Sequence, residues 1–149
     1  MAAIRSCLKS DLPQVMELLK ELAKSLGYQF EFDSQRMERQ FSSMEKDSEG
    51  YASFVYEEEG KLLGFISVVF YETMFHYKGT ALITELVVKE ESRGRRIGKA
   101  LLERVIEEAE KRRMDEVEVG VKKENKDAIR FYKRNGMNEE YILLGKELL

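Results

Sequence analysis

The stretch Leu82–Leu102 reads LITELVVKEESRGRRIGKALL, and its pattern changes twice along its length. Leu82–Val88 is apolar on both faces, which is typical of a strand buried inside a sheet. The next segment, Arg93–Gly98, brings three arginines and two glycines together within six residues, and a helical period begins at Ile97. A strand that enters a helix through such a turn presents free backbone N–H groups and the positive end of the helix dipole at one point. The stretch therefore predicts an anion-binding site, whose usual guest is a phosphate or pyrophosphate.

Two common phosphate motifs do not fit the turn. A P-loop has four residues between its glycines and then Lys-Ser or Lys-Thr, whereas Gly94 and Gly98 are separated by three and are followed by Lys99-Ala100. A dinucleotide-binding fingerprint fails on both spacing and position. The residues alone leave three readings open: a phosphate-bearing cofactor, nucleic acid bound by the arginine run, or a solvated turn.

Composition narrows the class of protein. The 149 residues are 43% hydrophobic and 36% charged, which predicts one globular domain over residues 1–149. The net charge of −3 gives no general basis for binding nucleic acid. One cysteine, Cys7, rules out an internal disulfide framework, and no apolar run has the length of a membrane span or a signal peptide. We therefore expect a cytoplasmic protein that has no membrane or nucleic-acid partner.

The remaining periodicity predicts an α/β (α+β) fold with a mixed, mostly antiparallel central sheet and about four helices. The turn after Leu82–Val88 and the helix that follows it form the crossover to a strand around Val117–Val121. The other predicted strands are Ala3–Leu8, Tyr51–Glu58, Leu62–Phe70 and a terminal strand, Tyr141–Leu148; the other predicted helices run from about Asp11 to Gly27, from Ser34 to Lys46 and onward from Asn125.

Two segments together resemble the GNAT superfamily of N-acetyltransferases. Glu85–Val88 followed by Arg93–Leu102 is similar to the family's acyl-CoA motif. A second segment resembles the family's asparagine-to-FY-to-NG pattern at the right distance, through Asn125, Ala128, Phe131, Tyr132, Asn135 and Gly136. The resemblance implies one GNAT-like domain that moves an acetyl group from acetyl-CoA to a primary amine, and the family's frequent pairing suggests a homodimer.

The resemblance also implies which residues hold the co-substrate. The pantetheine arm would pair with the central strand, and the pyrophosphate would meet the turn. The implied cofactor-binding residues are Leu86, Val87, Val88, Arg93, Gly94, Arg95, Arg96, Ile97, Gly98, Lys99, Asn125 and Tyr132. Arg96 departs from the family, which usually has glycine there, and a bulky residue costs little at that position only if its φ is negative.

Acetyl transfer needs a proton donor for the leaving thiolate and a base for the amine. The resemblance gives Tyr132 the donor role, against the alternative of an ordinary aromatic helix contact. Glu85 is the one carboxylate in Ala81–Val88, so it is the candidate base or water relay, against a structural or substrate-binding role. Asn125 either positions the cofactor or simply caps its helix. Glu118 is expected to be solvated, and Gly120 offers no acid from its strand.

The acceptor is the least defined part of this interpretation. Tyr28 and Phe30 belong to an aromatic loop that either caps the core or lines the substrate pocket, where Glu85 would also bind substrate. His76 has no partner at ligand spacing, so no metal is predicted. The acceptor predicted here is a small cationic metabolite; the alternatives are a protein N-terminus or lysine, or a non-catalytic CoA-binding protein.

Overall fold

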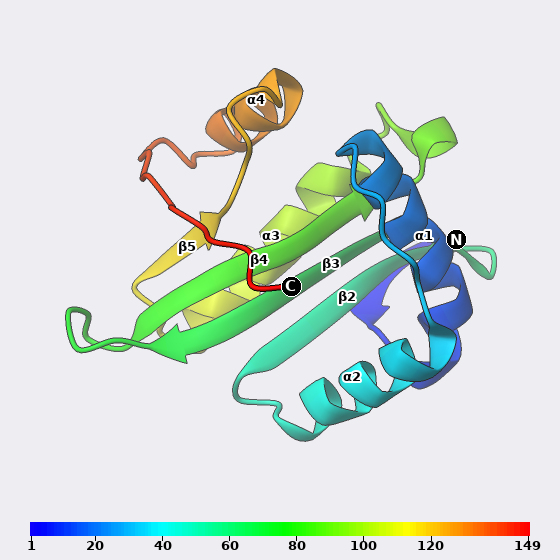
Figure 1. Cartoon of the computed structure of the whole chain (residues 1–149), viewed down its shortest axis with the longest axis horizontal. Helices are drawn as coiled ribbons and strands as arrows, with labels where there is room; N and C mark the ends of the chain where they lie inside the picture. The colour runs from blue at the N-terminus through cyan, green and yellow to red at the C-terminus, as the bar shows by residue number, and fades with distance from the viewer.

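The computed structural model describes residues 1–149 as one mixed sheet with helices packed on both of its faces (Figure 1). No helix combines the length and hydrophobicity that a membrane span requires. The elements are, in chain order, β1 (Ala2–Ser6), η1 (Lys9–Asp11), α1 (Leu12–Ser25), α2 (Ser34–Lys46), β2 (Tyr51–Glu58), β3 (Lys61–Glu72), β4 (Gly79–Val88), η2 (Glu90–Ser92), α3 (Ile97–Lys111), β5 (Glu116–Val119) and α4 (Lys126–Arg134).

The five strands lie in sequence order, β1-β2-β3-β4-β5. Every neighbouring pair is antiparallel except β4 and β5, which run parallel and are joined through α3. Parallel neighbours need a crossover connection, and here α3 supplies it. The predicted fold class, a mixed and mostly antiparallel sheet with four helices, is confirmed.

Each face of the sheet has its own hydrophobic cluster. On one face α3 packs through Ile97, Leu101 and Val105 against the sheet, including Ile66 of β3 and Ile83 of β4. On the other face α1 packs through Val15 and Leu18, and the cluster includes Val87 of β4. Figure 1 shows α3 crossing behind β3 and β4 in this view. β4 therefore contributes side chains to both clusters.

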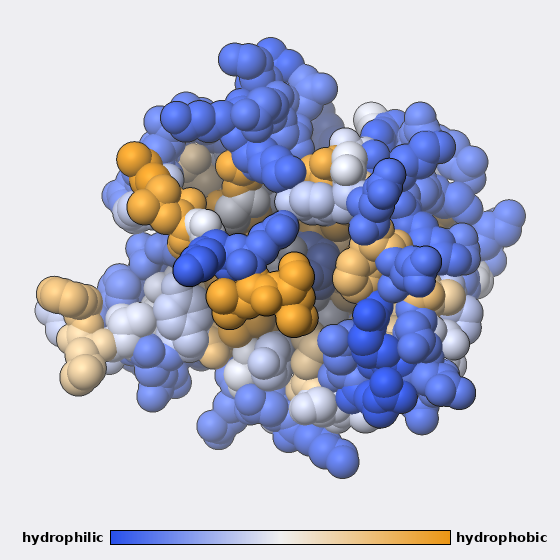
Figure 2. All heavy atoms as spheres, viewed as in Figure 1, coloured by the Kyte–Doolittle hydropathy of each residue, from blue (hydrophilic) through white to orange (hydrophobic).

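The predicted terminal strand is wrong. Residues 138–149 contain no helix or strand, and the segment crosses in front of the sheet in Figure 1. Ile142, Leu143 and Leu144 are exposed, and Figure 2 shows hydrophobic atoms gathered along the course of this segment. Tyr141–Leu148 has strand-like composition, but its backbone forms no hydrogen bonds with another strand; the Tyr141 hydroxyl lies 3.4 Å from Glu116 Oε2.

Several strand boundaries also differ from the predictions, among them those of β4 and β5. β4 begins at Gly79, before the predicted Leu82, because its first residues pair with the end of β3. β5 ends at Val119 rather than Val121, because its pairing with β4 stops there.

A glycine in β3 sets how closely α3 approaches the sheet. A Cβ atom at Gly64 would lie 2.8 Å from Leu101 Cδ1 and 3.0 Å from Ile97 Cγ2. Both of these side chains are essentially buried and belong to the first half of α3. The absence of a side chain at Gly64 therefore allows the N-terminal half of α3 to sit against β3.

Gly64→Ala should therefore force α3 away from the sheet. Adding a methyl group to a packed contact of this kind costs about 1–3 kcal/mol of folding stability. Urea unfolding of the purified protein measures the change. Gly145→Ala is the matched control, because a Cβ atom there meets nothing within 4 Å. Equal stability of the two variants would show that α3 does not depend on this close approach.

Candidate functional site

The candidate site begins where β4 and β5 part. Their register pairs run only from Thr80 with Glu116 to Ile83 with Val119. Beyond Ile83, no β5 residue pairs with β4, so the β5 side of residues 84–88 is left without a strand partner. Unpaired backbone N–H and C=O groups at this edge are available to an extended ligand.

A bulge at Thr84 changes the side-chain alternation of β4 at the same point. Ser67 pairs with Glu85 and Val68 pairs with Ile83, so Thr84 is the extra residue. Ile83 lies in the α3 cluster, whereas Val87, on the other side of the bulge, lies in the α1 cluster. Because a bulge reverses which side chains face each layer, Glu85 points away from the α3 face.

Glu85 is half-buried beside polar neighbours on β3 and β4. The Ser67 hydroxyl donates to Glu85 Oε1 at 2.5 Å and lies 2.7 Å from the Thr84 hydroxyl. The carboxylate is thus held by a hydroxyl and has no ion-pair partner within 4.0 Å. The geometry is compatible with either a base or a substrate-binding carboxylate.

The turn after β4 presents a row of free amides. The N–H groups of residues 94–99 have no backbone or side-chain acceptor in the protein, and the first bonded amide is that of Ala100, which donates to Arg96 O at 3.1 Å. The row ends at the N-terminus of α3, where the helix dipole adds positive potential. The predicted anion-binding geometry is present at this turn.

Arg96 takes the left-handed conformation, with φ 62° and ψ 23°, directly before α3. An arginine costs little at this position only if its φ is negative, and the φ of Arg96 is positive. The left-handed region costs a residue with a side chain roughly 1–2 kcal/mol. The backbone of this turn therefore requires what a glycine would supply without strain, as Gly94 does at φ 84°.

The turn, the end of β4 and α4 enclose a groove of about 950 Å³. Its other wall is the C-terminal end of α1, through Leu22, Ser25 and Leu26. The predicted cofactor residues that line the groove are Leu86, Val87, Val88, Arg93, Gly94, Arg96, Ile97, Gly98, Lys99, Asn125 and Tyr132. Residues far apart in the chain therefore meet around one elongated space.

Arg95 is the exception among these residues. Its guanidinium forms two hydrogen bonds with Glu58 of β2, at 2.8 and 3.1 Å, and does not line the groove. Arg93 instead donates from Nε to the carbonyl of Val88 at 3.3 Å. Both side chains link the turn to the sheet. The backbone N–H of Arg95 belongs to the row of free amides, whereas that of Arg93 does not.

Two α4 residues occupy the groove as the sequence predicts. Burial raises the pKa of Tyr132 to about 12, so its hydroxyl keeps a proton through neutral pH. The Asn125 side chain accepts the N–H of Ala128 at 3.2 Å, so it caps α4. The capping role of Asn125 is therefore present, and its role in positioning the cofactor stays a prediction.

Neither Tyr28 nor Phe30 lines the groove, although both lie in the loop that follows its α1 wall. Lys122 Nζ lies 4.3 Å from the centroid of the Tyr28 ring, and Phe30 packs edge-on against Phe32. Lys122 itself lines the groove, as do Glu124, Asp127 and Arg134. Sequence reasoning missed these four because they follow no motif and are placed by the connection from β5 to α4.

Glu118 is not fully solvated, contrary to expectation. It is half-buried and, like Glu85, on the face opposite α3, because it pairs with Leu82 between Val117 and Val119, which pack against the α3 cluster. Burial first, and then the neighbouring Glu116, raise the pKa of its carboxyl. Glutamates alternate with valines in β5, and residues i and i+2 of a strand point to the same face of the sheet. This alternation therefore predicts that Glu116 and Glu118 share one face.

Sequence comparison finds a family profile and a relative that match most of this chain. The sequence profile described as the Acetyltransferase (GNAT) family matches residues 13–137. An uncharacterized N-acetyltransferase of Methanocaldococcus jannaschii is 34% identical over 145 residues, which are 95% of this chain. The present chain spans 63% of the length of that relative.

Solved structures share the fold. Glucosamine-6-phosphate N-acetyltransferase from Arabidopsis thaliana superposes with a TM-score of 0.84 at 24% identity, covering 99% of this chain and 98% of that one. AAC(6')-Iy, in complex with the bisubstrate analogue CoA-S-monomethyl-acetylneamine, superposes with a TM-score of 0.83 at 17% identity, covering 100% and 99%. At such identities the likeness concerns the fold.

Arg96→Gly should stabilise the protein. The change removes the left-handed strain but makes the unfolded chain more flexible, so the net gain is roughly 0.5–1 kcal/mol. Thermal or urea unfolding at neutral pH measures it. Gly94→Ala is the converse variant, since it places a side chain at φ 84° and should destabilise. A loss of stability in Arg96→Gly would contradict this account of the turn.

Proposed function

We propose that this chain, which belongs to the GNAT family of acetyltransferases, transfers the acetyl group of acetyl-CoA to a primary amine. The observation that carries the proposal is the continuity of one groove from the row of free amides, along the end of β4, to Tyr132. A phosphate-bearing ligand with a long amide-containing arm fits such a groove at both ends. We further propose that residues 1–149 act as one N-acetyltransferase domain.

The turn residues would bind the pyrophosphate. The amides of Gly94 to Lys99 supply donors, and Arg93, Arg96 and Lys99 add positive charge around them. Leu86, Val87 and Val88 would pair with the pantetheine arm through the backbone that β5 leaves free. Acetyl-CoA itself supplies the activated acetyl group.

The amine nitrogen forms a bond to the thioester carbonyl carbon while the carbon–sulfur bond breaks, so one proton must leave nitrogen and one must reach sulfur. Tyr132 is the proposed proton donor to sulfur, because the residue lines the groove and its hydroxyl stays protonated at neutral pH. Glu85 is the proposed acceptor of the amine proton, directly or through water. Its place beside the free end of β4 supports this role.

A small cationic amine is the proposed acceptor. Glu85 and Glu118 lie on the same face of the sheet, and carboxylates there favour an ammonium ligand. Two solved structures of this fold are a glucosamine-6-phosphate N-acetyltransferase and AAC(6')-Iy in complex with a CoA-acetylneamine bisubstrate analogue. A cytoplasmic location and a homodimer remain proposals, supported respectively by the unpaired, buried Cys7 and by the exposed apolar side chains of residues 142–144.

Binding and turnover test the function separately. Acetyl-CoA should raise the melting temperature, whereas duplex DNA should not, because the free amides and groove fit a pyrophosphate and its arm. Release of free thiol from acetyl-CoA in the presence of a panel of amines then identifies the acceptor. The absence of any shift with acetyl-CoA would refute the proposal, and a shift without thiol release for any amine would indicate a CoA-binding protein.

Tyr132→Phe removes the proposed proton donor and keeps the ring. We expect kcat to fall by roughly 10²–10⁴-fold, the usual contribution of general acid catalysis, with little change in the KM for acetyl-CoA. Steady-state thiol release measures both. Tyr77→Phe, on the exposed β3–β4 connection, is the control for loss of a tyrosine hydroxyl. An unchanged kcat in Tyr132→Phe would assign the proton to another source.

A further inference from the structure

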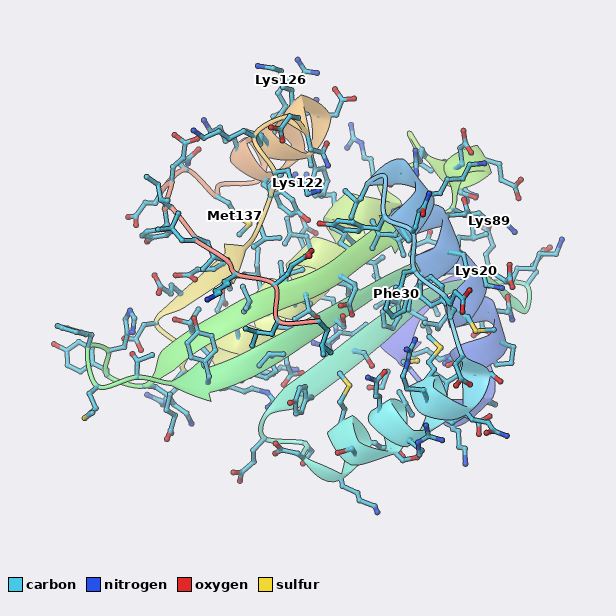
Figure 3. The ribbon with its side chains drawn as sticks, viewed as in Figure 1. Lys20, Phe30, Lys89, Lys122, Lys126 and Met137 are labelled. Atoms are coloured by element: carbon cyan, nitrogen blue, oxygen red, sulfur yellow. The ribbon has the colours of Figure 1, made fainter.

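One side-chain contact joins the two sides of the groove. Lys122 projects from the connection between β5 and α4, and its Nζ lies 4.3 Å from the centroid of the Tyr28 ring, in the connection between α1 and α2. Figure 3 shows Lys122 in the space between α4 and the C-terminal end of α1. An ammonium group over a tyrosine face is attracted by the ring quadrupole.

The segment that carries Tyr28 is preformed. The N–H of Tyr28 donates to Ala23 O at 2.9 Å, directly after Gly27 has turned the chain with a φ of 75°. Arg36 lies over the Phe30 ring at 4.7 Å and donates to Glu31 O at 3.1 Å. We call residues 28–33 the aromatic loop; these contacts hold it together as a unit.

The aromatic loop has few other attachments. Its remaining hydrogen bonds are local, with the Asp33 side chain accepting the N–H groups of Gln35 and Arg36 at the start of α2. No hydrogen bond, ion pair or aromatic contact other than that of Tyr28 joins it to the sheet or to the β5–α4 connection. The contact of Tyr28 with Lys122 is therefore the loop's one cation–π, hydrogen-bond or ion-pair link across the groove.

Lys122 is also suited to a contact that opens. It has no carboxylate within 4.0 Å, although Glu124 and Asp127 line the same groove. A cation–π contact at an exposed site is worth little, so it shifts an open–closed equilibrium only by roughly two- to five-fold. Such a contact biases the loop toward one position and still lets it move.

We propose that Tyr28 and Lys122 form a latch that holds the aromatic loop against the mouth of the groove and that opens when a ligand enters or leaves. The two residues then act as positioning residues: they place the aromatic loop on the acceptor side, the face that carries Glu85, without taking part in proton transfer. The latch itself is a property of the free protein, while its effect on the acceptor rests on the proposed function.

Hydrogen exchange of the Tyr28 amide, the one N–H of residues 28–33 that donates a hydrogen bond, followed by NMR in the free protein, tests the latch. Tyr28→Leu removes the ring and Lys122→Met removes the charge, and each should speed exchange by roughly two- to five-fold. The double variant should exchange no faster than either single variant, because both remove the same contact. Tyr28→Phe and Lys122→Arg, which keep ring and charge, should restore slow exchange. Tyr77→Leu and Lys78→Met, on the β3–β4 connection, are the matched controls.

The KM for the acceptor tests the positioning role. Tyr28→Leu and Lys122→Met should raise it by the same factor with kcat unchanged, and the conservative variants should reverse the rise. Unaltered exchange, or effects that multiply in the double variant, would overturn the latch. A fall in kcat at constant KM would overturn the positioning role. Failure of every amine to be acetylated, with exchange as expected, would refute the proposed function and leave the latch standing.

Discussion

The parting of β4 from β5 after Ile83 is the constraint on which the rest of the site depends. A strand inside a sheet normally forms backbone hydrogen bonds with two neighbouring strands. After Ile83, β4 has only β3 as a neighbour. The bulge at Thr84 reverses the alternation of its side chains at the same place. As a result one strand provides a free backbone edge, a carboxylate on one face and apolar packing on the other. The chain then leaves β4 directly into the turn that starts α3, so the amide row and the free edge are adjacent.

The turn is locally unfavourable, and its contacts with the surrounding structure stabilise it. Six amides lack acceptors and Arg96 is held in a left-handed conformation. Strain of this kind persists only where neighbouring contacts leave no alternative. Here Ile97 and Leu101 of α3 are buried against the sheet, Arg95 is paired with Glu58, and Arg93 is bonded to the end of β4. The arginines of this turn therefore act partly as structural ties, in addition to any attraction they exert on an anion.

Local pattern accounts for what the sequence predicted well. The strand, turn and helix around Arg93–Gly98 follow from neighbouring residues, because a helix start and its free amides are local features. Asn125 was predicted at the start of α4 for the same reason, and it caps that helix. The prediction of a terminal strand failed because composition does not decide whether a segment pairs with an edge, and residues 138–149 leave the outer edge of β5 unpaired. The φ of Arg96, the acid pair of β5 and the contact of Tyr28 with Lys122 likewise arise from tertiary packing.

The two hydrophobic clusters lie on opposite faces of β2, β3 and β4 and contain different helices, and this bears on how such a protein can diversify. Gly64 and α3 belong to the layer that fixes the amide row, while α1, α2 and the aromatic loop belong to the opposite layer. Substitutions in the second layer can reshape the acceptor side without moving the N-terminus of α3. The preference for an acceptor can therefore change in evolution while the anion-binding end of the groove stays the same. Only the shared strands β2, β3 and β4 have to remain compatible with both layers.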